Sequence, residues 1–453
     1  MSVVAWHLRP VRLGCLVLAF VLAASCQGGS NGTHRAASPA TGASGTPSTS
    51  PAGAPSASPS PMPAPPSTSP TPARPTPKVT PARPTSKPTR TAPPPGPTPA
   101  SGPTPQVIPS ASGGLRIGLS YPGVLTRMNA DALAHSLDDA VALGAAWIRL
   151  DLAWDAVQPN SPDAWDWSSF DSVVAAAGQR HLGVLPILQY TPTWARPILC
   201  TQSDHCAPAD PNQFAAFAAA AARHYASKDI HTWEVWNEPN TNSGWMPRAD
   251  PGQYASLVGA TSRAIKAADA AAVVISGGLA PAATGLGEIS QLDFLTGFAQ
   301  AGGLASVDAV GYHPYSMPVL SPGFDLGDAW RQMSSPPRSF QSVLTSFGFP
   351  GMKIWSTEYG APTNGPGPVA TAANPLGVMN ADHVDEQVQA LMAAQSVARA
   401  KSSPLVAALF WYTQSDSGTD ATNREDFFGL RRADGSAKPA YGALQQAIAA
   451  ART

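Results

Sequence analysis

The chain has 453 residues, 13% of them charged, and a formal net charge of −1 at pH 7. The charge is unevenly distributed, because eight of the 28 basic residues but none of the 29 acidic residues precede residue 113. Residues 113–453 therefore hold 20 basic and 29 acidic side chains, a net charge of −9, which argues against nucleic acid as the main partner.

The first 26 residues have the composition of a bacterial export signal. Arg9 and Arg12 precede an apolar run over residues 13–24, and small residues at 23–25 suit a cleavage position. The apolar run is shorter than the roughly 20 residues that span a bilayer. Cys26 follows directly and resembles a lipobox cysteine, so we expect export with either a lipid anchor on Cys26 or plain secretion.

Residues 27–112 form a linker of biased composition. They contain 24 of the chain's 49 prolines, no aromatic residue and no acidic residue. Such a segment cannot bury enough apolar surface to offset its chain entropy, so we predict a disordered or polyproline-like tether. The remaining residues, 113–453, suffice for one barrel domain.

From residue 115 onward, short apolar segments alternate with Ala-rich amphipathic segments. The apolar segments predict strands over residues 115–120, 146–152, 182–190, 231–236, 272–277, 307–313, 352–358 and 405–412. The amphipathic segments predict helices over residues 130–143, 168–178, 211–226, 251–268, 290–301, 339–347, 381–400 and 439–450. Asp210 before Pro211 is an example of a capping residue followed by a first-turn proline.

Eight consecutive strand–helix units favour a closed (β/α)8 TIM barrel, an α/β fold, over an open doubly wound sheet. The sequence has no Gly-x-Gly-x-x-Gly motif after the first strand and no Gly-Lys-Ser/Thr loop, so nucleotide binding lacks support. We expect neither an organic cofactor nor a metal.

The domain contains two cysteines, Cys200 and Cys206, close together in one loop. In the oxidising compartment that export implies, this spacing predicts a local disulfide. A metal site formed by both cysteines and His205 is the alternative, but the spacing matches no common zinc pattern.

Acidic side chains stand at the ends of two predicted strands. Glu238 follows the fourth strand within Trp236-Asn237-Glu238-Pro239-Asn240, and Glu358 ends the seventh. Pro239 cannot continue a strand ladder, so Asn237 and Glu238 project from the strand's C-terminal end, where a TIM barrel carries its active site. Two carboxyl groups there suit cleavage of a glycosidic bond: one protonates the leaving oxygen, and the other attacks the anomeric carbon or guides water.

Other strand ends supply a cation, hydrogen-bonding rings and aromatic surfaces. Arg149 on the second strand would lower the pKa of a neighbouring carboxyl, so that the two glutamates titrate apart. We group seven residues as substrate-binding candidates: Arg149, Tyr190, Asn237, Trp245, His313, Tyr315 and Trp411.

The run from Trp236 to Asn240, together with Trp355-Ser356-Thr357-Glu358, resembles the retaining glycoside hydrolases of clan A, which are (β/α)8 barrels. The resemblance extends over residues 113–453. It implies that Glu238 is the acid/base, that Glu358 is the nucleophile and that Asn237 donates to the sugar 2-hydroxyl. No metal or cofactor is implied.

Three further positions carry the resemblance. Arg149 resembles the clan's second-strand arginine, which keeps the nucleophile ionised, and His313-Pro314-Tyr315 resembles the sixth-strand His-x-Tyr, whose ring hydroxyl contacts the nucleophile. The third-strand exit that begins at Tyr190 looks most like family 39, which includes β-xylosidases and exopolysaccharide hydrolases. Family 5, the cellulase family, is the second choice, because it usually places a histidine where Tyr190 stands.

Two tryptophans are candidates for sugar stacking. Trp411 would floor the sugar subsite, and Trp245, in the loop after Glu238, would carry a further sugar. Structural roles compete with the functional ones, since Trp411 could be packing, His313 a core histidine and Arg149 an ion-pair partner of Asp151.

The sequence thus predicts an exported, monomeric retaining glycosidase that hydrolyses a β-linked polysaccharide or oligosaccharide outside the cell or at its surface. A non-hydrolytic glycan-binding barrel and a transglycosylase that remodels envelope polysaccharide remain open. The sugar, the linkage and endo or exo action depend on the loops around Tyr190 and Trp245 and on residues 314–335 and 413–428.

Overall fold

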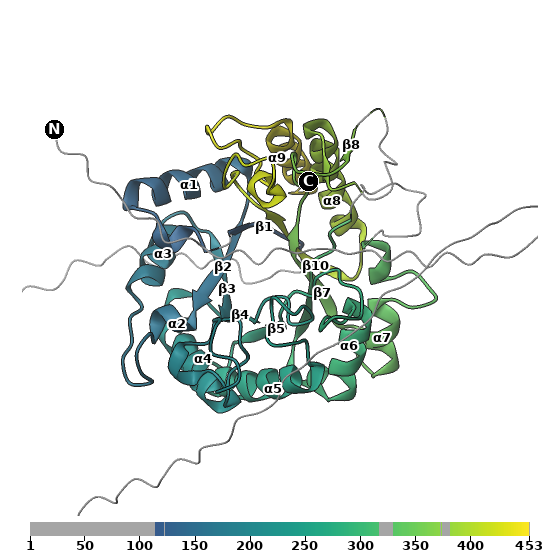
Figure 1. The fold of residues 1–453 in the computed structure, drawn as a ribbon. Coiled ribbons are helices and arrows are strands. Elements are labelled where there is room, and N and C mark those ends of the chain that lie inside the picture. Colours follow the sequence, from purple (N-terminus) through teal and green to yellow (C-terminus); the bar gives the residue numbers. More distant parts are fainter. Residues whose placement is uncertain (1–113, 122, 317–328, 372, 374–380, 453) are drawn as a thin grey trace, which may run out of the picture. The chain divides into compact units, whose positions relative to one another are not determined.

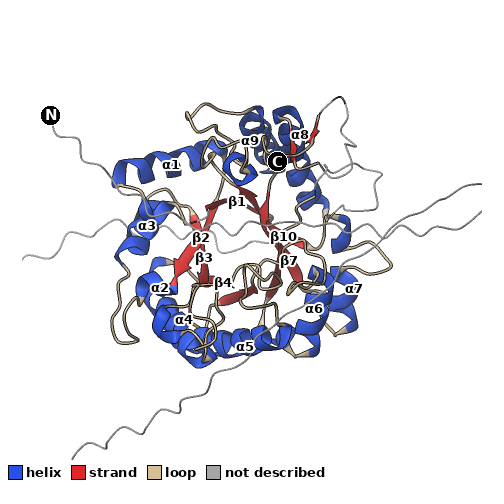
Figure 2. Cartoon of the chain, in the orientation of Figure 1, coloured by secondary structure: helices blue, strands red, loops and turns tan. Residues whose placement is uncertain are grey.

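The computed structural model describes residues 114–121, 123–316, 329–371, 373 and 381–452. Eight parallel strands close into a barrel, with helices around its outside (Figures 1 and 2). The strands are β1 (Arg116–Tyr121), β2 (Trp147–Ala153), β3 (Gly183–Gln189), β4 (Thr232–Val235), β5 (Val273–Ser276), β6 (Ala309–Tyr312), β7 (Lys353–Tyr359) and β10 (Val406–Tyr412). Their order around the barrel is β1-β10-β7-β6-β5-β4-β3-β2, which confirms the predicted TIM barrel.

The helices of the described residues follow the strands as the sequence predicts, except that the short helix α2 after β2 was not predicted. They are α1 (Ala130–Leu143), α2 (Trp154–Val157), α3 (Ser168–Gly178), α4 (Pro211–Tyr225), α5 (Pro251–Ala268), α6 (Gln291–Gln300), α7 (Phe340–Ser346), α8 (Glu386–Ser402) and α9 (Pro439–Arg452). Short 3-10 helices lie at Leu125–Arg127, Thr193–Ala195, Ala226–Lys228, Gly303–Ser306, Arg331–Met333 and Arg424–Phe427.

Capping side chains fix where several of these helices begin. Asp210 accepts a hydrogen bond from the Asn212 amide ahead of α4. The predicted start of the helix at residue 381 was wrong, because Asp385 caps α8 by accepting from the Val388 amide. The residues just before it form β9 (His383–Val384), which pairs with β8 (Val369–Ala370).

The barrel interior is filled in layers. Alternate side chains of a strand point to one face. Trp147, Arg149 and Asp151 of β2 therefore follow one another inside the barrel, from its N-terminal end toward the mouth at the C-terminal strand ends. The lowest layer is apolar, and Trp355 of β7 packs there edge-on against Trp147 and stacks on Phe410. A second apolar cluster fills the space between the barrel and the helices.

Irregular backbone at the strand ends aims polar side chains into the mouth. Tyr190, Trp236 and Glu238 all have positive φ values, of 68°, 71° and 49°, which interrupt the alternation of strand side chains. On β7 the pairing with β10 shifts by one residue before Tyr359. In a regular strand Glu358 would point outward like Ile354, four residues earlier. The bulge turns its side chain inward.

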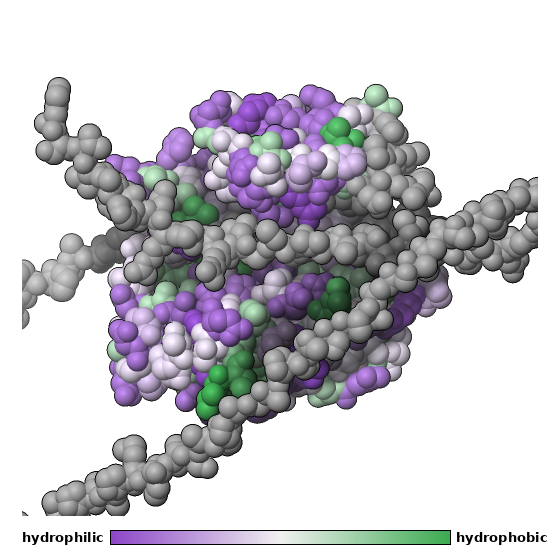
Figure 3. All heavy atoms as spheres, viewed as in Figure 1, coloured by the Kyte–Doolittle hydropathy of each residue, from purple (hydrophilic) through white to green (hydrophobic). Residues whose placement is uncertain are grey.

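Predictions about the export signal, the linker and Cys26 lie outside the described residues, as does the stretch 317–328 of the loop 314–335. Among the residues that the structure describes, no helix combines the length and the apolar character needed to cross a membrane. The described surface in Figure 3 is mostly hydrophilic or intermediate, and its hydrophobic residues form small separate patches.

Candidate active site

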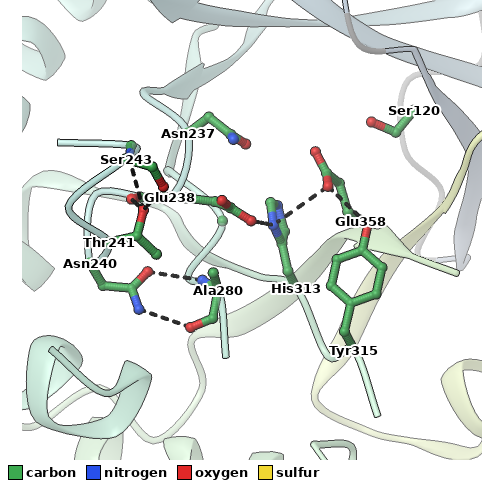
Figure 4. Close-up of polar contacts among 12 residues, drawn as sticks. Ser120, Asn237, Glu238, Asn240, Thr241, Ser243, Ala280, His313, Tyr315 and Glu358 are labelled. Atoms are coloured by element: carbon green, nitrogen blue, oxygen red, sulfur yellow. Dashed lines mark hydrogen bonds and ion pairs between the residues drawn. The ribbon is translucent and has the colours of Figure 1, made fainter. Parts of the chain in front are cut away.

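The two strand-end glutamates meet at the mouth of the barrel, from β4 and β7 (Figure 4). A carboxylate oxygen of Glu238, one of Glu358 and a ring nitrogen of His313 all lie within 4.8 Å of one another. Retaining glycosidases hold their two carboxyl groups about 5–5.5 Å apart, whereas inverting enzymes need about 6.5–9.5 Å. The separation therefore fits attack by a carboxylate rather than by an intervening water.

Arg149 lies directly beneath this pair and is 1% exposed. Its guanidinium donates to Glu358 Oε1 at 2.6 Å, to Asn237 Oδ1 at 2.7 Å and to Ser120 Oγ at 2.9 Å. Two more bonds, of 2.6 and 3.0 Å, go to both oxygens of Glu234, which is fully buried. The arginine is therefore engaged by the protein and acts through Glu358 and Asn237, which corrects its grouping with the residues that touch substrate.

The partners of Arg149 also settle the competing structural interpretation. Its carboxylate partners are Glu234 and Glu358, and no ion pair joins it to Asp151 within the described part of the chain. Because Arg149 holds Oδ1 of Asn237, the amide NH2 of Asn237 is left to face the mouth as a donor.

His313 and Tyr315 hold the glutamates from the β6 side. The Nδ1 atom of His313 lies 3.0 Å from Glu238 Oε1 and 3.7 Å from Glu358 Oε2. Tyr315 donates its hydroxyl to Glu358 Oε2 at 3.0 Å. His313 is fully buried and its ring fills space beside Gly278, where a Cβ would collide with it. His313 thus positions the glutamates, and Tyr315, which is partly exposed, borders the mouth.

The electrostatic surroundings keep Glu358 ionised. Burial raises the pKa of this carboxyl, but the neighbouring His313 and Arg149 and the hydrogen bonds from Arg149 and Tyr315 outweigh it, so the pKa is lowered. The pKa of Tyr315 is raised, by burial first and by the Glu358 charge second, so the phenol remains a donor.

Tyr190 lies across the mouth from His313, at the end of β3. Its hydroxyl is 3.4 Å from Asp151 Oδ2, and its ring packs against that of His205 at 5.2 Å between centroids. Tyr190 is partly exposed. The structure therefore brings it into the mouth, where the sequence predicted it.

The prediction for Trp411 was wrong. This side chain is 1% exposed and packs edge-on against Tyr359 outside the barrel. The next residue, Tyr412, points the other way because strand side chains alternate. Tyr412 is partly exposed and meets Tyr315 and Phe428 edge-on, at centroid distances of 6.5 and 5.2 Å. The aromatic wall of the mouth is therefore built by Tyr412 rather than Trp411.

The prediction of a sugar platform at Trp245 was also wrong. Trp245 is 1% exposed and lies between Trp236 and Tyr254, both of which it meets at edge-on angles. The loop folds back because Trp236 donates its indole N–H to the Gly244 carbonyl at 2.6 Å. Trp245 therefore anchors the Glu238 loop in the core and cannot stack on a sugar.

Sequence reasoning missed Glu234 and Ser120 as partners of Arg149. Glu234 also accepts from the Gly278 amide at 2.9 Å, which fixes the chain at the end of β5. A signal was present, because Glu234 falls on the inward side of β4, where an acid requires a buried cation. Nothing comparable marked Ser120.

The structure contains the disulfide predicted between Cys200 and Cys206. The loop that it closes is tied to β3, since Thr191 donates its hydroxyl to the Cys206 carbonyl at 2.6 Å. The same loop is tied to the Glu238 loop, since the Met246 amide donates to the His205 carbonyl at 2.9 Å. It thus links two walls of the mouth.

Comparison with known proteins supports the same assignment. Residues 118–397 match the family described as cellulase (glycosyl hydrolase family 5). No curated protein matches the chain significantly. This family was the second choice from the sequence, after family 39 of the same clan.

Solved structures of both families have similar folds. A family 39 glycoside hydrolase from Bacteroides cellulosilyticus WH2 has 20% identity and a TM-score of 0.55, over 74% of this chain and 63% of that one. The corresponding values are 20%, 0.53, 74% and 66% for the GH39 enzyme from Xanthomonas axonopodis pv. citri. They are 20%, 0.53, 75% and 81% for a single-residue variant of GH5_18 from Streptomyces cattleya in complex with Manβ1-4GlcNAc.

The chain spans less than two thirds of the two family 39 structures, and identities this low show the fold alone. The family match, in contrast, covers β2 to β7 and both strand-end glutamates. The chain belongs to the cellulase family, glycosyl hydrolase family 5, within the clan A barrels that its strand ends resemble.

Proposed function

We propose that the protein is a retaining glycosidase that hydrolyses β-linked polysaccharides or oligosaccharides, with Glu358 as nucleophile and Glu238 as acid/base. The observation that carries the proposal is the approach of the two carboxylates to within 4.8 Å, at a barrel mouth that also presents amide and phenol donors. Family membership and the partners of each glutamate support the same division of roles.

The surroundings of each glutamate suit a different step. Glu358 is held ionised by Arg149 and Tyr315, so it can attack the anomeric carbon and form a glycosyl ester while the bond to the leaving oxygen breaks. Glu238 gives its proton to that oxygen, and then takes a proton from the water that releases the sugar from Glu358. His313 touches both carboxylates and fixes the gap between them.

Replacing each glutamate tests these roles. On a panel of β-linked polysaccharides and aryl β-glycosides, Glu358→Gln should lose at least about a thousandfold in kcat on every accepted substrate. Glu238→Gln should lose less on dinitrophenyl glycosides than on oligosaccharides, because a good leaving group needs little acid assistance. Glu386→Gln is the matched control, since Glu386 lies on α8 outside the barrel and forms an ion pair with Arg432. Equal losses on both leaving groups would refute the acid/base role of Glu238.

The same experiment separates two other activities. A non-hydrolytic glycan-binding barrel would bind oligosaccharides without turnover, and Glu358→Gln would leave that binding unchanged. A transglycosylase would form longer products when acceptor sugars are added, because its glycosyl ester is released to a sugar hydroxyl instead of water. The approach of these two partly exposed carboxylates to within 4.8 Å favours hydrolysis over binding alone.

We also propose that the enzyme acts outside the cytoplasm. The apolar run at residues 13–24 and the Pro-rich tether support export, and the local disulfide suits an oxidising compartment. Metabolic labelling with a lipid probe distinguishes the two modes: a signal that Cys26→Ser abolishes means an anchor, and its absence with enzyme in the medium means secretion. Intact residues 1–26 on enzyme retained in the cytoplasm would contradict export.

A further inference from the structure

Asp151 is an acid in the barrel mouth to which the proposed mechanism gives no role. It lies two residues after Arg149 on the inward face of β2, so it stands one layer, about 6.7 Å, closer to the mouth. Its side chain is partly exposed there. The Gly123 backbone passes close to its Oδ2 atom, since a Cβ on Gly123 would lie 3.3 Å away.

The partners of Asp151 are neutral. Gln189 donates its amide to Oδ1 at 2.5 Å, and the Tyr190 hydroxyl lies 3.4 Å from Oδ2. In the part of the chain that the structure describes, Asp151 forms no ion pair, because Arg149 is committed to Glu234 and Glu358. Burial raises the pKa of Asp151 to about 6, although the Arg149 charge and the Gln189 bond oppose the rise. A carboxylate that is desolvated at the barrel mouth without an ion-pair partner is a candidate for binding a ligand.

The position of Asp151 relative to the glutamates indicates what it would bind. Glu238, His313 and Glu358 come from β4, β6 and β7, whereas Asp151, Gln189 and Tyr190 come from β2 and β3. A sugar with its anomeric carbon between the two glutamates, and its 2-hydroxyl at Asn237, extends its far side across the mouth. The far side of a pyranose ring carries the hydroxyl groups of carbons 3 and 4.

We propose that Asp151 is a specificity-determining residue, whose carboxylate accepts hydrogen bonds from the 3- and 4-hydroxyl groups of the sugar that is cleaved. Gln189 fixes one oxygen of the carboxylate, and Tyr190 stands beside the other as a second partner for the same sugar. The proposal rests on the proposed function, and it defines the substrate as a sugar with both hydroxyl groups free. An ionised carboxylate accepts hydrogen bonds and donates none. Glycosides whose 3- or 4-hydroxyl is methylated should therefore be poor substrates, because they have lost the O–H donor.

Coupling between the residue and the substrate hydroxyl groups tests the proposal. On the best aryl β-glycoside of the panel, Asp151→Asn should lower kcat/KM about 10- to 100-fold, the range for hydrogen bonds to a charged group. On the 3-deoxy and 4-deoxy analogues of that glycoside, the same substitution should lower kcat/KM less, because one of the two hydrogen bonds to Asp151 is already absent. Asp163 is an exposed aspartate on the connection between α2 and α3, so Asp163→Asn should leave kcat/KM unchanged on both the parent and the deoxy substrates.

The outcomes are distinguishable. Equal losses on the parent and deoxy substrates, or no loss on either, overturn the role of Asp151 while wild-type turnover keeps the proposed function intact. If wild type cleaves no glycoside of the panel, the proposed function fails and the role of Asp151 with it. If Asp151→Asn does not fold, Asp151→Ser, which is smaller and uncharged, should show the same coupling.

Discussion

Five hydrogen bonds link Arg149 to Ser120, Glu234, Asn237 and Glu358. The planar guanidinium fixes the positions of Glu234, Asn237 and Glu358 at once, which the ammonium group of a lysine could not do. Burial opposes the guanidinium charge, but Glu234 and Glu358 outweigh it and raise the pKa of Arg149. At the scale of single residues, Arg149 therefore helps to keep the Glu358 carboxylate ionised, together with His313 and Tyr315.

Tyr315 offers a milder test of that control. Tyr315→Phe removes the hydroxyl that donates to Glu358 Oε2 and leaves the ring packing in place. Since the bond lowers the pKa of Glu358, its loss should raise that pKa. A nucleophile must be ionised, so the acidic limb of the kcat/KM profile should move to higher pH. A profile that keeps its acidic limb would show that Tyr315 does not tune Glu358.

At the scale of elements, the strand ends explain both the correct and the incorrect site predictions. Glu238 and Glu358 could be found because their residue type and flanking motifs are distinctive. Trp411 and Tyr412 are adjacent aromatics, and only the register of β10 against β7 decides which one faces inward. The burial of Trp245 depends on a loop that folds back, and no local pattern encodes that.

Trp411 and Tyr412 lie on opposite faces of β10, so substituting each should have a different effect. Tyr412→Ala should lower kcat/KM at least about tenfold with little change in melting temperature, because Tyr412 lines the mouth. Trp411→Ala should instead destabilise the protein by about 3–5 kcal/mol, since it empties a packed site against Tyr359. Kinetics and thermal unfolding of both variants check the pair, and the reverse pattern would refute the assignment of faces.

The disulfide loop should stabilise the mouth without taking part in the chemistry. Replacing Cys200 and Cys206 by serine releases a short loop, which should cost roughly 2–3 kcal/mol and a few degrees in melting temperature. The Thr191 and Met246 bonds still hold the loop, so kcat should change less than about threefold. A large loss of kcat at a temperature where the variant is folded would assign the loop a catalytic role.

At the scale of the whole molecule, the barrel was predictable from the alternation of eight strands with eight helices. Each strand and each helix has its own hydrophobic periodicity, which can be recognised in the sequence. The identity of the catalytic pair followed, since parallel strands bring their C-terminal ends to one face. The Arg149–Glu234 pair and the bulge before Tyr359 depend instead on strand register, which only the closed barrel defines. These details decide which side chains face the mouth.

The central claim is that Glu358 attacks the sugar while Glu238 lies within one sugar's width of it. Mass spectrometry after incubation with a 2-deoxy-2-fluoro β-glycoside of the accepted sugar, with a good leaving group, tests this most directly, because fluorine slows release of the glycosyl ester. The account predicts one added sugar, on a peptide that contains Glu358, and none in Glu358→Gln. A sugar attached to Glu238, or turnover that inverts the anomeric centre without labelling, would contradict it.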